Sequence, residues 1–120
     1  MKIAIPVLED KGENSIISEH FGHSPFFAFV NLNEKSFTVE VEKNPLENHG
    51  PGDIPEYLKN KGVDLLIVRG IGQRALVFFD QFGIKVIRGA NGTVNKIINK
   101  YLENELKDTE YEVKEKFHEH

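Results

Sequence analysis

The spacing of apolar and polar residues along the chain predicts five β-strands and three helices. Short runs of β-branched and aromatic residues indicate strands, whereas apolar residues three or four positions apart indicate helices. The strands are expected at residues 2–7, 26–32, 36–41, 64–68 and 84–87. The helices are expected at residues 54–60 after a capping Asp53, at 73–82, and from Thr93 onward, with Val94, Ile97, Ile98, Tyr101 and Leu102 on one face.

The order of these elements, β-β-β-α-β-α-β-α, predicts an α/β domain built on one mixed sheet with helices packed on it. A meander places the first three strands side by side, and right-handed crossovers place the fourth and fifth. The expected strand order is 3-2-1-4-5, with only the second strand antiparallel to the others. Pro6 favours a sheet edge or a strand end, because proline cannot donate to the ladder.

The length of 120 residues suits a single domain, which is expected to cover residues 1–106. Residues 107–120 are mostly charged and are expected to form a solvated tail or a partly ordered extension. The chain has no cysteine and a net charge of −4, which argues against a permanent thiolate-held cluster and against general nucleic-acid binding. Neither a membrane-spanning apolar run nor a signal-peptide pattern is found, so a cytoplasmic location is expected.

Strand directions bring four loops rich in Gly, His and Arg to the carboxyl edge of the sheet. The loop before the second strand contains His20 and His23, and the loop after the third contains His49. Residues 69–74 follow the fourth strand, and residues 88–92 follow the fifth. Open α/β sheets bind ligands at this edge, so the four loops are the candidate site.

The histidines have two interpretations that the residues alone leave open. His20, His23 and His49 could supply three nitrogens, the minimum for an open zinc-type site. Alternatively, each ring could bond to loop backbone and form a polar collar on a core strand. His118 and His120 lie in the charged tail and are expected to be exposed.

The segment RGIGQRA, which contains Arg69, Gly70, Gly72 and Arg74, matches the pattern G-x-G-x-x-A between a strand and a helix. Such a loop lets an anion approach backbone amides at a helix N-terminus. A dinucleotide site is disfavoured, because the next strand ends at Arg88 rather than at an acidic residue. Glycines that only permit a tight turn are the alternative interpretation.

Five segments occur in an order that resembles the dinitrogenase iron–molybdenum cofactor biosynthesis family, the NifX-like domain, over about residues 1–102. They are MKIAIPV, SEHFGHSPFFAFVNL, NHGPGDIPEYL, KGVDLLIVRGIGQRA and GIKVIRGANGTVNKII. The resemblance implies a three-layer, ribonuclease-H-like fold and the binding of iron–sulfur or iron–molybdenum clusters or their precursors. It also implies that His20, His23 and His49 lie at the cofactor cleft beside the loop of residues 70–74. Arg69 and Gln73 depart from the Gly and Pro that this family often shows.

The expected function is therefore the binding or transient carriage of an anionic metal cluster rather than catalysis. Arg69, Arg74 and Arg88 would attract the cluster, and imidazole can coordinate iron. The expected partner is the cluster itself or a cluster-delivery protein, with no nucleic acid and no membrane; the oligomeric state is not predicted.

Two other functions remain as alternatives. The first is a small phosphate-handling or metal-dependent enzyme; a two-metal nuclease is disfavoured because the central strands carry only Asp64, at the wrong end. A histidine-based hydrolase would have to use Ser18 or Ser24 beside His20. The second alternative is a protein interaction module that binds no small ligand.

Overall fold

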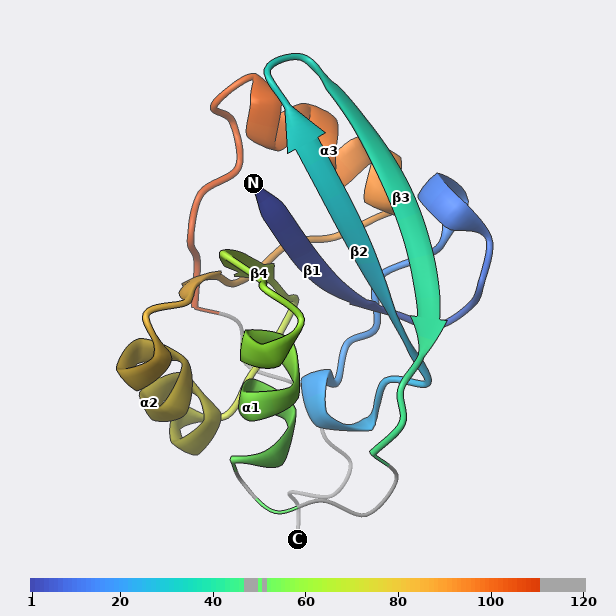
Figure 1. Ribbon diagram of the computed structural model, residues 1–120. Helices are drawn as coiled ribbons and strands as arrows, with labels where there is room; N and C mark the ends of the chain where they lie inside the picture. The colour runs from blue at the N-terminus through green and yellow to red at the C-terminus, as the bar shows by residue number, and fades with distance from the viewer. Residues whose placement is uncertain (47–49, 51, 111–120) are drawn as a thin grey trace, which may run out of the picture.

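The computed structural model describes residues 1–46, 50 and 52–110, and Figure 1 shows one sheet with helices around it. The sheet order is β3-β2-β1-β4-β5. The strands are β1 (Lys2–Val7), β2 (Phe26–Asn33), β3 (Ser36–Lys43), β4 (Leu65–Ile67) and β5 (Lys85–Ile87). The helices are α1 (Asp53–Asn60), α2 (Gln73–Phe82) and α3 (Val94–Leu102), with short 3-10 turns η1 (Gly12–Asn14) and η2 (Phe21–His23).

The strand directions confirm the predicted mixed sheet. β2 pairs antiparallel with both β1 and β3, while β1 pairs parallel with β4 and β4 pairs parallel with β5. Only β2 therefore runs against the others, and the carboxyl ends of β1, β3, β4 and β5 share one edge.

Helices cover both faces of the sheet. Successive side chains of a strand point to opposite faces, so each central strand contributes to the core on both sides. Ile3 and Ile5 of β1 join the core cluster that contains Ile97 of α3. Ala4, between them, joins the cluster that contains Leu58 of α1 and Phe79 of α2. The layers are therefore α3, the sheet, and the α1–α2 pair.

Of the two positions predicted for Pro6, the sheet edge is wrong, since β1 lies at the centre of the sheet, and the strand end is confirmed, since β1 ends at Val7. The parallel pairing of β1 with β4 covers only Ile3↔Leu65 and Ala4↔Leu66. Beyond it, the amide of Ser18 donates to the carbonyl of Pro6 at 2.8 Å. The chain that follows β1 thus returns to pair with its last residues, and Pro6, one residue before the strand ends, marks this change of partner.

The helix ends differ in how they are capped. Thr93 caps α3, because its side chain accepts a hydrogen bond from the Lys96 amide at 3.3 Å. Asp53 was expected to cap α1 but is its first residue, and its carboxylate accepts from the Gly50 amide at 2.8 Å. Among the described helices, none has the length and apolar character needed to cross a membrane.

After α3 the chain returns along one side of the molecule (Figure 1, orange to red). It reaches the residues that follow β5, where the Thr109 amide donates to the Arg88 carbonyl at 2.9 Å. The beginning of the predicted tail is thus attached to the domain. His118 and His120 lie outside the described residues.

Candidate functional site

The loop that carries the histidines lies across the carboxyl ends of the parallel strands. His20 forms a parallel β-bridge with Gly70, the residue that opens the turn between β4 and α2. A few residues earlier, the Ile17 amide donates to the Gly92 carbonyl at 3.0 Å, in the loop after β5. The loops that follow β1, β4 and β5 therefore meet at one edge, as the strand directions predict.

This meeting point lies where the chain changes direction across the sheet. β1 and β4 are neighbours, but the chain proceeds from β1 toward β2 and from β4 toward β5, on opposite sides. Ligands of open α/β sheets bind at such switch points, outside the carboxyl ends of the strands. The segment from Ser18, bonded to Pro6, to His20, bridged to Gly70, spans this point.

A buried phenylalanine holds the two histidines at the surface. Phe21 is 7% exposed, and its ring packs against those of Phe79 at 5.5 Å and Phe27 at 6.3 Å between centroids. His20 is half-buried and His23 is exposed, and their ring centroids lie 6.5 Å apart at an interplanar angle of 65°. The phenylalanine of HFGH is thus a core residue, and its burial positions the imidazoles next to each other.

The metal set predicted from the sequence is placed only in part. His49 lies outside the described residues, so its distance from the other two rings is not defined here. Within residues 1–46, 50 and 52–110, no group of three or more His, Asp or Glu side chains could hold a metal ion. His20 and His23 together supply two nitrogens, so any metal held by them needs further ligands from elsewhere.

The start of α2 is open to a ligand. Gly72, its N-cap, is exposed with φ −76°, and a Cβ built on it would meet no atom of the described residues within 4 Å. Neither backbone strain nor packing therefore requires glycine there, and the tight-turn interpretation fails for Gly72. Gly70 is buried at the bridge, and Arg74 is exposed in the first turn of α2. No described side chain therefore caps the N-terminus of α2, the kind of helix end at which anions bind in other proteins.

Arg69 connects two of the loops at this edge. It is half-buried, and its guanidinium donates to the Ala90 carbonyl at 3.4 Å. Its own carbonyl accepts from the Gly89 amide at 3.0 Å. Arg69 therefore contributes positive charge while it joins the loop after β4 to the loop after β5.

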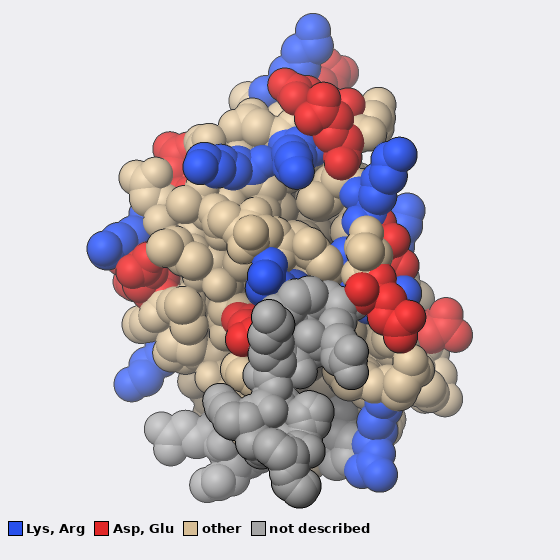
Figure 2. Space-filling view, turned by 180° about the vertical axis from the view of Figure 1, so that it is seen from behind, with Lys and Arg blue, Asp and Glu red and all other residues tan. Residues whose placement is uncertain are grey.

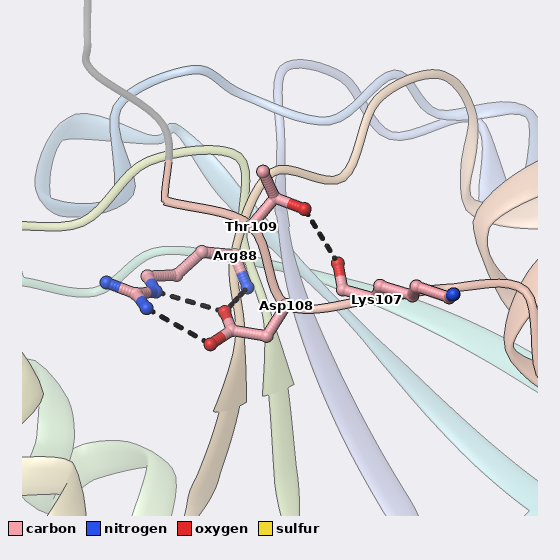
Figure 3. Close-up of polar contacts among 4 residues, drawn as sticks. All are labelled: Arg88, Lys107, Asp108 and Thr109. Carbon is pink, nitrogen blue, oxygen red and sulfur yellow. Dashed lines mark hydrogen bonds and ion pairs between the residues drawn. The ribbon is translucent and has the colours of Figure 1, made fainter.

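The sequence predicts that Arg88 attracts a ligand, but in the structure its guanidinium is bound to the Asp108 carboxylate (Figure 3). The Arg88 Nε and Nη2 donate to the two oxygens of the Asp108 carboxylate at 3.0 and 3.1 Å, and the Arg88 amide donates to Oδ1 at 2.7 Å. The hydrogen bonds from the Arg88 side chain lower the pKa of the Asp108 carboxyl below its ordinary value. Sequence reasoning missed Asp108, since no local pattern distinguishes it from the other acidic residues of the tail.

A small cavity of about 280 Å³ lies beside His23. Its lining residues are Gly22, His23, Ser24, Pro25, Lys43, Asn44 and Leu46. Buried Asn44 joins its two walls: its side chain donates to the Ser24 carbonyl at 2.9 Å and accepts from the Leu46 amide at 3.0 Å. The Ser24 hydroxyl is buried and has no hydrogen-bond partner in the described part of the chain.

On the face of the molecule seen in Figure 2, the described lysine and arginine side chains form no continuous patch. On the face shown in Figure 2, acidic and basic side chains are interspersed around a largely uncharged area. A nucleic-acid interface gathers lysine and arginine into a continuous patch.

One relative and two solved structures resemble the chain closely enough to be informative. An uncharacterised protein of Methanocaldococcus jannaschii, MJ0580, is 33% identical over 114 residues, which cover 92% of each chain. The crystal structure of PH0822 superposes with a TM-score of 0.83 at 36% identity, covering 95% of this chain and 100% of that one. The NMR structure of TM1290 from Thermotoga, described as a candidate NifB protein of the DUF35 family, gives a TM-score of 0.73 at 29% identity over 95% and 97% of the two chains.

A more distant structure shows the same fold. The apo form of the orange protein from Desulfovibrio gigas superposes with a TM-score of 0.77 at 19% identity, covering 90% of this chain and 92% of that one.

The sequence matches the model of the family described as "Dinitrogenase iron-molybdenum cofactor" over residues 1–104. This range includes every described strand of the sheet and all three helices. The chain therefore belongs to the dinitrogenase iron–molybdenum cofactor family.

Proposed function

We propose that this protein binds and transiently carries an anionic iron–sulfur or iron–molybdenum cluster, or a precursor of one, at the carboxyl edge of its sheet. The observation that carries the proposal is the bridge between His20 and Gly70. This bridge supports the proposal because it brings the loop of His20 and His23 against the residues that precede α2. Family membership supports the same class of cargo.

The residues at this edge have two roles in the proposal: some attract the anionic cargo by charge, and others coordinate its metal. The amides at the start of α2, left open by Gly72, and the exposed Arg74 attract the anionic cargo. Arg69 adds charge and holds the loop after β5 in place. His20 and His23 coordinate the metal, and His49 is proposed as a third ligand because the family resemblance places it at the cleft.

Labile binding follows from the types of ligand. The chain contains no cysteine, so no thiolate can hold a cluster permanently. Imidazole and backbone donors release a cluster more readily, which suits a carrier that delivers its cargo to a partner protein. The three-layer arrangement and the strand order also support, as an inference, the ribonuclease-H-like assignment of the fold.

The enzyme alternative receives no support from the serines near the site. The Ser18 hydroxyl donates to the backbone carbonyl of His20 at 3.2 Å rather than to an imidazole. The Ser24 hydroxyl makes no hydrogen bond within the described residues. An activated serine needs a base within hydrogen-bond reach, and neither hydroxyl has one there.

The proposal is tested by anaerobic incubation with iron–sulfur precursors, followed by metal analysis and absorption spectra. His20→Ala and His23→Ala should remove the acid-side loss of binding, because protonation near pH 6.5 prevents coordination in the parent protein. Arg74→Ala should weaken binding and flatten its salt dependence while it keeps the pH profile. Lys35→Ala, on the hairpin between β2 and β3, is the control for a lost positive charge.

One result would overturn the ligation. If both histidine variants bind the cluster as tightly as the parent at every pH, the two imidazoles are a polar collar on β2 and not ligands.

A further inference from the structure

The Arg88–Asp108 pair has the geometry of an anion-binding position. Three donors of one residue, its amide, Nε and Nη2, surround a single carboxylate at 2.7–3.1 Å. A bidentate guanidinium with an added backbone amide matches any group that presents two oxygens, whether carboxylate or oxyanion. Figure 3 shows that the group bound there comes from the chain's own C-terminal segment.

Beside this position, the C-terminal segment packs closely against the backbone of Arg88 and Gly89, a surface that we call the seat. Gly89 has φ +88°, and a Cβ built on it would lie 2.8 Å from the Thr109 carbonyl oxygen. The Thr109 amide donates to the Arg88 carbonyl at 2.9 Å. The absence of a side chain at Gly89 therefore lets the segment approach closely.

The seat is continuous with the candidate cluster site. The Gly89 amide donates to the Arg69 carbonyl at 3.0 Å, and the Ala90 amide donates to the Val68 carbonyl at 3.1 Å. Arg69 adjoins Gly70, which bridges to His20. Asp108 thus lies at the end of the same row of loops that leads from the histidines across the carboxyl edge.

We propose that Arg88 and its amide form a second anion-binding position of the carboxyl edge, for a carboxylate or oxyanion group, and that Asp108 is its resident ligand. An incoming anion replaces Asp108 and releases the segment from Lys107 to Glu110. This inference rests on the proposed function, because it assigns the Arg88 position to the same anionic cargo or to an anionic group that arrives with it.

The exposure of the pair makes the exchange feasible. The Asp108 side chain is 44% exposed and that of Arg88 is 24% exposed, so water and salt weaken their attraction. Residues 107–110 are all exposed, so few buried contacts oppose their release. A soluble anion can therefore compete with Asp108 by mass action.

Inorganic phosphate and malonate serve as oxyanion and dicarboxylate probes, and hydrogen exchange of the Thr109 amide reports whether the segment is seated. Asp108→Asn should bind phosphate roughly 2- to 5-fold more tightly than Glu105→Gln, which makes the same charge change in the same segment without touching Arg88. Gly89→Ala should likewise bind phosphate more tightly than Glu105→Gln, because its Cβ would displace Thr109 while the charges of Arg88 and Asp108 remain. In the parent protein, saturating phosphate should accelerate Thr109 exchange, and Arg88→Ala should abolish that response.

The inference is overturned if Asp108→Asn binds phosphate no more tightly than Glu105→Gln, or if phosphate binds while Thr109 exchange stays unchanged. Its failure is distinguishable from that of the proposed function. Cluster uptake that leaves Thr109 protected removes the inference and keeps the carrier. Phosphate-driven release in a protein that takes up no cluster keeps the anion position and removes the carrier.

Discussion

The end of α1 and the start of α2 use their charged groups in different ways. At the end of α1, the Lys2 ammonium donates to the Lys61 carbonyl at 2.7 Å, and the Lys2 amide donates to Asp64 at 2.9 Å. Lys61 pairs with Glu42 at 2.6 Å, and both lysines lie over the Phe29 ring, at 5.3 and 5.2 Å. The charges of this region stabilise one another and the sheet beneath them.

At the start of α2 the polar groups are left available. Gly72 offers no capping side chain, and for Arg74 no partner is found among the described residues. In the loop after η2, the buried Ser24 hydroxyl also lacks a hydrogen bond within the same residues. Within the described residues, the polar groups are thus satisfied at the end of α1 and not at the start of α2, which is consistent with the binding role proposed for the second end.

The largest expected effect on stability comes from truncating Phe21, whose ring joins the histidine loop to α2. Phe21→Ala deletes a ring that packs on Phe79 of α2 and on Phe27, so it should lower the free energy of unfolding by about 3 kcal/mol. Urea denaturation measures the loss. A control truncation at the surface, Val77→Ala, should cost far less, because Val77 is 54% exposed. A loss below about 1 kcal/mol for Phe21→Ala would show that the histidine loop is not held by this ring.

The sequence could predict the sheet because the relevant information is local. The strand pattern of residues 2–7, the helix of residues 73–82 and the order of elements suffice, since connection rules leave few ways to join them. The meeting of His20 with Gly70 also followed, because strand direction alone brings those loops to one edge.

Long-range pairings could not be predicted in the same way. Asp108 binds Arg88 across 20 residues, and several acidic residues of the tail offered the same charge. Asn44 joins the walls of the cavity beside His23 through backbone groups that carry no sequence signal. Which residues contact the cargo stays a prediction, since the described structure shows placement and not binding.

Removing the unsatisfied hydroxyl in the loop after η2 should stabilise the protein. Ser24 is 2% exposed, and an unpaired buried hydroxyl costs about 1–3 kcal/mol relative to a satisfied one. Ser24→Ala should therefore raise the free energy of unfolding by about 1 kcal/mol, measured in urea. The control is Ser18→Ala, which removes a hydroxyl bonded to the His20 carbonyl and should destabilise instead. Destabilisation by Ser24→Ala would mean that the hydroxyl has a partner after all.

The paired charges at the end of α1 should make stability fall at high pH. The hydrogen bond to Glu42 raises the pKa of Lys61, and burial raises the pKa of Tyr57. Both groups hold their protons more tightly in the folded state, so their contribution is complete below about pH 10 and is lost as the pH rises through the folded values. Lys61→Met should flatten this loss and cost less than about 1 kcal/mol at pH 7, because the pair is partly exposed. Urea denaturation at several pH values tests it, and an unchanged high-pH slope in Lys61→Met would contradict it.

The smallest expected change in stability, Gly72→Ser, gives the sharpest test of the open helix end. The backbone at Gly72, with φ −76° and ψ 157°, suits a capping serine, and a Cβ there meets no atom within 4 Å in the described part of the chain. The serine oxygen can accept from the free amides of the first turn, so the variant should gain a few tenths of a kcal/mol, about 0.3. The same oxygen then occupies the donors that an anionic cargo needs, so cluster uptake should fall even though the fold is firmer. Metal content after anaerobic loading, measured beside urea denaturation, separates the two effects. A variant that is stabilised and still loads like the parent would show that the start of α2 is an open end without a ligand.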